Sequence, residues 1–394
     1  MKKICCVFSM LVLVLSLFVS CGNGKKRMVA SYIRTWPLGS TPEEMEARQE
    51  HWSSETVKAE YLTDLIIAFG GINMDTWKIY FPDIEDDKMP FPQIWDEVSA
   101  LKAKYPKLNI SVSIGGWGCD GFSQMCSLPE RRKIFVQAVV DLVTQKKLDG
   151  IDYDWEYPIG PEWGQEIASS PDDGVNFISL LEETRTAFNE LTSKTGKHYS
   201  ISCAIPASEW YFKKLDVIKI ASYLDSVKLM SYDFYGGWSD QTGHNSNLYN
   251  NPKDPDWGGW SIKQSVDLCL KAGLPRDKII VGVAFYGRAW KGVKDNGVHG
   301  LYQPFEESAY GDGLSWDDIE DKIYKDPSFV RYWDDVGKAP FLYDGNTFIS
   351  YTDGEELKLV SDYIKKNKLG GVMIWEYGHD INARLLKPLY KSLN

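Results

Sequence analysis

The sequence predicts an α/β fold: a (β/α)8 TIM barrel with a small α+β insertion between strand seven and the last helix and strand. Two observations predict it. Eight short, β-branched segments recur along the chain, and amphipathic helical patterns separate most of them, which is the order of a parallel barrel. An open, doubly wound sheet is the weaker alternative, because the sequence has no phosphate-binding motif of the type GxGxxG or GxxxxGK[ST].

The strands and helices follow from periodicity. The predicted strands are Met28–Ile33, Leu65–Phe69, Asn109–Ile114, Gly150–Trp155, Tyr199–Ile205, Ser226–Met230, Ile279–Phe285 and Gly371–Trp375. Apolar residues at helical spacing predict helices at Glu130–Gln145, Val175–Leu191 and Ser261–Ala272, and Glu355–Lys365 precedes the eighth strand.

One connection is much longer than a single helix requires. Between Phe285 and Gly371, the segment 289–348 has short apolar runs, Gly turns and aromatic residues of its own. Because such a segment is too aromatic to stay solvated, we expect an α+β insertion there rather than a disordered loop. The barrel itself is then expected over residues 29–288 and 349–394.

The first 21 residues are predicted to be a processing signal. A basic start precedes an apolar run from Val7 to Val19, which is too short to span a bilayer and stay there. The run closes on LFVSC, ending at Cys21, which resembles a bacterial lipobox. The resemblance implies cleavage before Cys21, its acylation, a polar tether over residues 22–28, and an exported lipoprotein anchored at the membrane. An ordinary signal peptide with an incidental Cys is the alternative.

Composition and cysteine usage limit the partners. The net charge is −11, so nucleic acid is not expected, because its binding depends on Lys and Arg at the phosphates. No cofactor and no metal are expected, since the five His are scattered and CxxC and HExxH motifs are absent. Cys119 and Cys126 share one Gly-rich loop, where a disulfide and two free thiols are both open. The expected state is a monomer.

The strongest chemical signal is the segment DGIDYDWEYP, which begins at Asp149. Alternate residues of a strand share a face, so Asp152, Asp154 and Glu156 are predicted to point into the barrel together. Burial and mutual repulsion must raise at least one of their pKa values. Glu156 comes last, at the end of the strand where barrel enzymes place their active sites, and a protonated Glu156 suits donation to a leaving oxygen. Asp149 has the opposite parity and is predicted to anchor the strand.

The pattern DxxDxDxE resembles the signature of family 18 glycoside hydrolases, the chitinase family. Further segments are similar to that family and occur in the same order along the chain. They are Ser113-Ile114-Gly115-Gly116-Trp117, Met230-Ser231-Tyr232-Asp233, Phe285-Tyr286-Gly287-Arg288 and the strand GGVMIW that ends at Trp375. The resemblance covers roughly Val29 to the C-terminus. It implies a chitin or chitooligosaccharide substrate.

The resemblance also implies a retaining, substrate-assisted reaction, an exception to the usual scheme of two protein carboxylates. Glu156 would be the general acid and base, and the 2-acetamido group of the substrate would be the nucleophile. Asp154 would orient that group, Asp152 would share a proton with Asp154, and Tyr232 would hydrogen-bond the acetamido oxygen. The implied sugar-binding residues are Trp375, Asp233, Met230, Tyr286, Arg288, Trp117, Tyr32, Trp36 and Phe69, and the implied structural residues are Asp149, Ser113, Gly115 and Gly116.

Two other functions stay open at this point. An endo-β-N-acetylglucosaminidase that cuts N-glycan cores shares the acidic motif, but such enzymes generally lack the insertion. A non-catalytic chitin-binding lectin would keep the barrel and lose the acidic residue, whereas Glu156 is present here.

Overall fold

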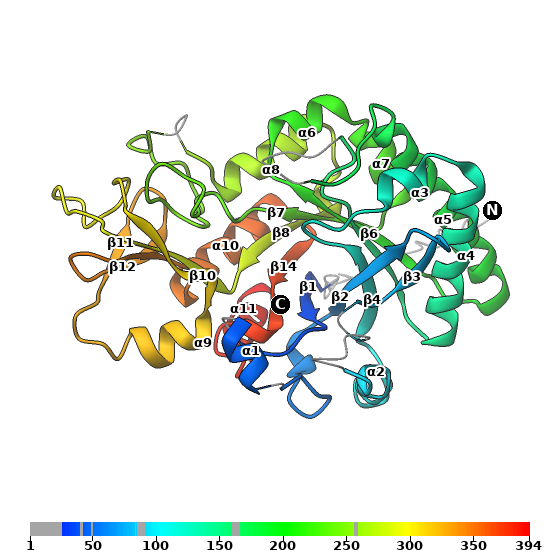
Figure 1. Ribbon diagram of the computed structural model, residues 1–394, viewed down its shortest axis with the longest axis horizontal. Helices are drawn as coiled ribbons and strands as arrows, with labels where there is room; N and C mark the ends of the chain where they lie inside the picture. The colour runs from blue at the N-terminus through cyan, green and yellow to red at the C-terminus, as the bar shows by residue number, and fades with distance from the viewer. Residues whose placement is uncertain are drawn as a thin grey trace, which may run out of the picture.

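The computed structural model describes residues 26–39, 42–48, 50–82, 84, 91–159, 166–255 and 259–394. The predicted signal peptide with Cys21 lies outside the described residues. Eight parallel strands form the barrel (Figure 1). It is closed by the pairing of β1 with β2, the two ends of the strand order. The order is β1 (Met28–Arg34), β14 (Gly371–Trp375), β8 (Ile279–Ala284), β7 (Ser226–Met230), β6 (Ser200–Pro206), β5 (Gly150–Asp154), β4 (Asn109–Gly115) and β2 (Asp64–Asn73).

The predicted barrel is therefore confirmed, and strand alternation explains its two faces. On β5, Tyr153 points outward, where its ring lies 6.5 Å from Phe135 of α4 (Pro129–Gln145) and 6.4 Å from Phe177 of α5 (Asp173–Thr195). The intervening Asp152 and Asp154 take the opposite face and are buried in the barrel interior. The apolar outer face thus packs on the helices, while the inner face carries the polar chemistry.

The remaining elements surround the barrel. The α-helices are α1 (Pro42–Arg48), α2 (Ile94–Lys104), α3 (Phe122–Cys126), α6 (Glu209–Lys214), α7 (Val217–Tyr223), α8 (Ile262–Lys271), α9 (Trp316–Asp318), α10 (Gly354–Asn367) and α11 (Leu386–Leu393). The short helical turns are η1 (Ala59–Tyr61), η2 (Arg276–Lys278), η3 (Ile319–Ile323) and η4 (Tyr377–His379), and β3 (Lys78–Tyr80) forms a hairpin with β2. In the part of the chain that the structure describes, no helix is long and apolar enough to cross a membrane.

The predicted insertion is a five-stranded antiparallel sheet at one side of the barrel (Figure 1). Its strands run in the order β10 (Glu307–Ser315), β9 (Tyr286–Lys291), β13 (Phe348–Ser350), β12 (Ala339–Tyr343) and β11 (Val330–Asp334). Trp290, Phe341 and Phe348 form its own small core. The first part of the barrel was expected to run to residue 288, but the structure places Tyr286 and Arg288 in β9, a strand of this sheet.

Cys119 and Cys126 are free thiols. Cys126 is fully buried, and burial raises the pKa of its thiol well above the ordinary range. Of the two states that the sequence left open, the structure therefore has the reduced one, and Cys126 acts as a packing residue.

Candidate active site

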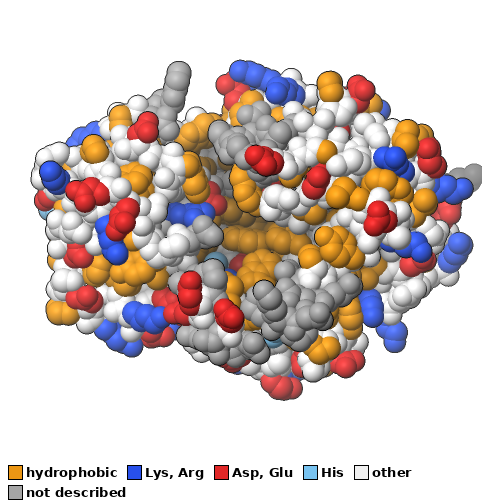
Figure 2. Space-filling view, viewed as in Figure 1, with side chains coloured by type: hydrophobic (Ala, Val, Ile, Leu, Met, Phe, Trp, Pro, Cys, Tyr) orange, Lys and Arg blue, Asp and Glu red, His pale blue; other side chains and the backbone are white. Residues whose placement is uncertain are grey.

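The face shown in Figure 2 is hollowed across its middle, and hydrophobic side chains form the bottom of the hollow. Stacked rings account for an aromatic floor at the barrel mouth. The Phe69 ring stacks on Trp375 at a centroid distance of 5.6 Å and on Trp36 at 6.4 Å, and Tyr32 lies 5.5 Å from Trp375. Four of the predicted sugar-binding residues therefore form one aromatic cluster, in which Tyr32 is buried: Tyr32 on β1, Trp36 just after it, Phe69 on β2 and Trp375 on β14.

Two glycines let β4 approach β5 and the aromatic floor. Gly115 and Gly116 have φ values of +124° and +91°, which residues other than glycine rarely adopt. A Cβ on Gly115 would lie 2.1 Å from the carbonyl oxygen of Asp154, and one on Gly116 would lie 2.7 Å from the Phe69 ring. The Gly116 amide also donates to the Asp154 carbonyl at 2.9 Å. Both glycines are therefore needed to hold the carboxylate strand in place.

Asp152 is buried and saturated with donors. Its Oδ2 accepts from the Tyr32 hydroxyl at 2.8 Å and from Ser113 at 2.7 Å. Its Oδ1 accepts from Ser202 at 2.6 Å and from the Lys228 ammonium group at 2.8 Å. Burial alone would raise the pKa of Asp152, but Lys228 and the hydroxyl donors hold that pKa below its ordinary value.

Asp154 and Glu156 have the opposite electrostatics. Burial, Glu156 and Asp152 raise the pKa of Asp154 well above its ordinary range, and Asp154 Oδ1 is buried with no hydrogen-bond partner among the described residues. Burial raises the pKa of Glu156 to about 7, with Asp233 adding to the rise and a hydrogen bond from Tyr157 opposing it. The sequence predicted a raised pKa for at least one carboxyl of this motif, and both Asp154 and Glu156 have one. The pair can hold a proton near neutral pH.

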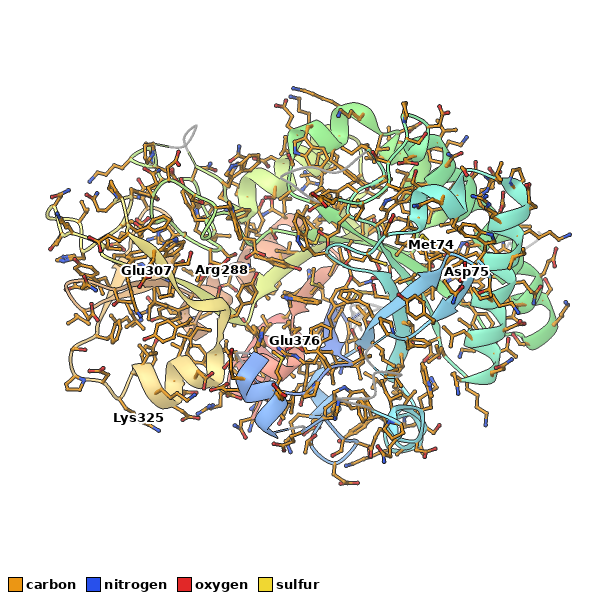
Figure 3. All side chains as sticks on the ribbon, in the orientation of Figure 1. Met74, Asp75, Arg288, Glu307, Lys325 and Glu376 are labelled. Atoms are coloured by element: carbon orange, nitrogen blue, oxygen red, sulfur yellow. The ribbon has the colours of Figure 1, made fainter. Side chains whose placement is uncertain are left out.

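Tyr232 and Asp233 follow β7 on the opposite wall. Burial raises the pKa of Tyr232 well above the ordinary range, so its hydroxyl stays protonated and can donate. Asp233 Oδ1 accepts from the Tyr286 hydroxyl at 2.7 Å and from Arg288 Nε and Nη2 at 2.9 and 2.8 Å. These contacts join the insertion to the barrel mouth, and Figure 3 shows Arg288 and Glu376 on the side of the barrel where the insertion begins.

Two tryptophans are displayed to solvent near the carboxylates. Trp117, which follows the two glycines, is 60% exposed, and Trp238 is 64% exposed. The Arg288 guanidinium lies 5.0 Å from the Trp238 ring. Met230, by contrast, is half-buried and packs in the interior cluster beneath Tyr232. Exposed indole rings at a groove rim suit stacking on sugar faces.

Asp149 lies at the other end of β5. It pairs with Lys102 and, at 2.6 Å, with Lys197, and it accepts from the Ile110 amide at 2.8 Å. Asp149 therefore connects the start of β5 to β4 and to two lysines, away from the groove.

Sequence reasoning missed three buried charges. Lys228 is 2% exposed inside the barrel. Arg34 pairs with Glu376, the residue after Trp375, at 2.7 Å, and its Nη2 lies 2.8 Å from His379 Nε2. A signal for Lys228 was available: it has the same strand parity as Met230, so a lysine on the inner face of a buried strand could have been noticed.

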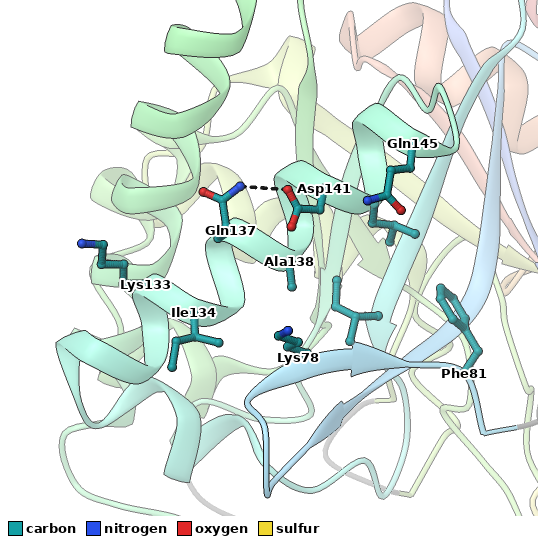
Figure 4. A pocket seen from close by; sticks show the side chains of 10 residues that line it. Lys78, Phe81, Lys133, Ile134, Gln137, Ala138, Asp141 and Gln145 are labelled. Carbon is teal, nitrogen blue, oxygen red and sulfur yellow. Dashed lines mark hydrogen bonds between the residues drawn. The ribbon is translucent and has the colours of Figure 1, made fainter.

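A second hollow lies outside the barrel between β3 and α4 (Figure 4). Its wall is mainly apolar, with Phe81, Ile134 and Leu142, and Gln137 donates to Asp141 at 2.9 Å. None of the predicted site residues lines it. Among the described residues, no group of three or more His, Cys, Asp or Glu side chains is placed to hold a metal ion.

Comparison with known proteins agrees with this geometry. The family model described as glycosyl hydrolases family 18 matches residues 40–380. The chain is 32% identical to chitinase A1 of Niallia circulans over 357 residues, which is 87% of this chain and 50% of that protein. It is 29% identical to chitinase B of Serratia marcescens, covering 86% of this chain and 77% of that one. The chain spans about half the length of the first two curated relatives it matches.

Solved structures match as well. A family 18 N-acetylglucosaminidase from Paenibacillus barengoltzii is 37% identical with a TM-score of 0.79, covering 93% of this chain and 100% of that chain. A chitinase from Bacillus thuringiensis is 28% identical with a TM-score of 0.83, covering 94% and 70%.

Proposed function

Because the chain belongs to family 18 of the glycosyl hydrolases, we propose that it is a chitinase that cleaves β-1,4-linked N-acetylglucosamine polymers, with Glu156 as general acid and base. One observation carries this proposal. The buried Oδ1 of Asp154 has no partner among the described residues, and it lies beside a Glu156 carboxyl whose pKa is raised to about 7. A buried acceptor requires a donor, and the N–H of a substrate acetamido group supplies one.

In the first step, the protonated Glu156 gives its proton to the glycosidic oxygen as the bond from that oxygen to C1 breaks. The carbonyl oxygen of the substrate's own acetamido group bonds to C1 and forms a cyclic oxazolinium ion. Asp154 accepts from the acetamido N–H and faces the positive charge, while the Tyr232 hydroxyl donates to the acetamido oxygen and aligns it. No protein atom bonds to the sugar.

In the second step, water attacks C1 from the face that the leaving group vacated. The ionised Glu156 takes a proton from that water, and the C1–oxygen bond of the oxazolinium ring breaks. The acetamido group is restored, and Glu156 is again protonated. Because C1 is inverted twice, the anomeric configuration is retained.

The direct test uses substrates that differ in one group. Chitooligosaccharides should be hydrolysed, whereas glucose oligomers of the same linkage should not turn over even where they bind, because they lack the nucleophile. A thiazoline analogue of the cyclised sugar should inhibit competitively, since it resembles the intermediate. Hydrolysis of the glucose oligomers, or a glycosyl adduct on any carboxylate in trapped enzyme, would show that the mechanism is wrong.

A second candidate is release of single N-acetylglucosamine residues, favoured by the similarity to the Paenibacillus barengoltzii N-acetylglucosaminidase. The initial products from a chitin pentamer separate the two: monomer with tetramer favours this candidate, and dimer with trimer favours a chitinase. A high-mannose glycopeptide in parallel tests cleavage of N-glycan cores.

We also propose that the protein is an exported, monomeric lipoprotein with its lipid at Cys21, as the LFVSC motif suggests. The anchor would keep the enzyme at the cell envelope. A polymeric substrate cannot enter the cell, so it would have to be cleaved there.

A further inference from the structure

We propose that Lys228 is a positioning residue for the reaction: its ammonium group holds Asp152 as a fixed anion, which confines the proton of the site to Asp154 and Glu156. The inference rests on the proposed function for its catalytic part only. The Lys228–Asp152 pair is a property of the fold and can be tested without substrate.

Lys228 is buried inside the barrel. It lies on the inner face of β7, is 2% exposed, and donates to Asp152 Oδ1 at 2.8 Å and to the Ser202 hydroxyl. A lysine is almost never fully buried unless it is paired, because the charged form is costly to desolvate. Asp152 is its ion-pair partner. The ammonium group therefore requires a negative charge on Asp152.

Asp152 is surrounded by hydrogen-bond donors. An ionised carboxylate offers about four lone-pair positions. Here two donors point at each oxygen: Tyr32 and Ser113 at Oδ2, Ser202 and Lys228 at Oδ1. A proton on Asp152 would displace one of these donors or turn its hydroxyl away. The four contacts also fix the position of the carboxylate, so Asp152 is an immobile anion.

This arrangement changes the role expected for Asp152. Proton sharing between Asp152 and Asp154 was expected from the sequence, but four donors already occupy the Asp152 carboxylate and leave it little room to take a proton. The fixed charge of Asp152 instead raises the proton affinity of Asp154. A proton taken from Asp154 can then pass only to Glu156 or to substrate.

Other titratable groups near Lys228 define what else its removal would affect. Besides Asp152 and Asp154, its charge acts on Asp64 of β2 and Cys203 of β6. Burial raises the pKa of both. Asp64 is the first residue of β2, and Cys203 has the opposite strand parity to Ser202, whose hydroxyl bonds Asp152 in the barrel interior. A change in the pH dependence of catalysis after removal of Lys228 therefore reflects altered pKa values in the carboxyl groups of Asp152, Asp154 and Glu156.

The test is Lys228→Met, which keeps an unbranched side chain and removes the charge. Asp152 then becomes a buried carboxyl without a cation and takes up a proton at neutral pH. Asp154 loses the nearby anion, which raises its pKa, and also Lys228, which lowers that pKa by less; its pKa therefore falls, and the basic limb of the kcat profile should move to lower pH. We expect kcat on a fluorogenic chitobioside to fall about tenfold or more, with KM changed by no more than about threefold, because Lys228 does not line the groove.

Lys102→Met is the matched control. It removes the same charge from a lysine of α2 that pairs with Asp149, just before β5 at the end away from the groove, where Lys197 remains as a second partner. It should lower thermal stability and leave the pH profile unchanged. A Lys228→Met enzyme that is folded and has the wild-type kcat and pH profile would overturn the positioning role.

Thermal unfolding provides the second readout and needs no substrate. In Lys228→Met the pKa of folded Asp152 exceeds its unfolded value, so the contribution of that group to stability is present below the unfolded pKa and is lost as pH rises. The loss of Tm relative to wild type should therefore be larger at pH 7 than at pH 4. An equal loss of Tm at pH 7 and pH 4 would contradict the proposal that Asp152 is a fixed anion. If wild type hydrolyses no N-acetylglucosamine substrate, the proposed function fails, while this readout still decides the Lys228–Asp152 pair.

Discussion

Glu156→Gln should remove activity and at the same time stabilise the protein at alkaline pH. The raised pKa of Glu156, about 7 against an ordinary 4.5, means that the folded state binds this proton more tightly than the unfolded chain. The contribution of Glu156 to stability is therefore complete below about pH 4.5 and is lost as pH rises through 7. At 1.36 kcal/mol for each pKa unit, the loss approaches about 3 kcal/mol by pH 8. Glutamine does not titrate and avoids it.

Thermal unfolding of the two proteins between pH 5 and pH 8 measures this difference. For a chain of this size, about 3 kcal/mol corresponds to a Tm difference of roughly 4 °C, growing with pH in favour of the variant. The same preparation should show turnover reduced about 10²-fold or more. Glu190→Gln, an exposed carboxyl on α5, is the control and should show no pH-dependent difference. A Tm difference that stays constant from pH 5 to pH 8 would refute the claim that the fold holds Glu156 neutral.

Three further outcomes follow from the structure and the sequence. Gly116→Ala should cost about 2 kcal/mol or more in urea unfolding, because its Cβ would meet the Phe69 ring at a φ of +91°; wild-type stability would contradict the close approach. Arg34→Met should cost about 3–5 kcal/mol, because it leaves Glu376 buried without its cation, and a smaller loss in the same assay would mean that water reaches that carboxylate. Cys21→Ala should release the protein from the membrane fraction with its activity intact, and a wild type without acyl groups by mass spectrometry would disprove the anchor.

Strand periodicity was sufficient to predict the barrel because each parallel strand is buried on both sides and reads as a compact β-branched run. The same signal failed at Tyr286 and Arg288. Phe285 alone separates β8 from β9, and no Gly or Pro turn marks the point where the chain leaves the barrel. The segment from Ile279 to Lys291 therefore contributes one strand to the barrel and one to the insertion sheet, and nothing in its sequence marks the boundary.

Within the site, parity predicted which side chains point inward, but not which of them meet. Asp152 and Lys228 lie on strands that are not neighbours, with β6 between them. Their contact depends on the register and closure of the barrel, which a single strand does not encode. The stacking of Trp36 on Phe69 has the same origin, because it joins a residue just after β1 to a residue within β2.

The order of charges along β5 explains how one barrel interior tolerates its carboxylates. Asp149, at the amino end, pairs with two lysines near the surface, and Asp152 pairs with the buried Lys228. Only Asp154 and Glu156, toward the open end, lack a cation, and these are the two with raised pKa values. An uncompensated buried carboxyl costs stability, so it persists where a ligand completes its contacts. Compensation therefore ends where substrate is expected to begin. Along this segment, the loss of cations coincides with the end of the site that the acidic motif indicates.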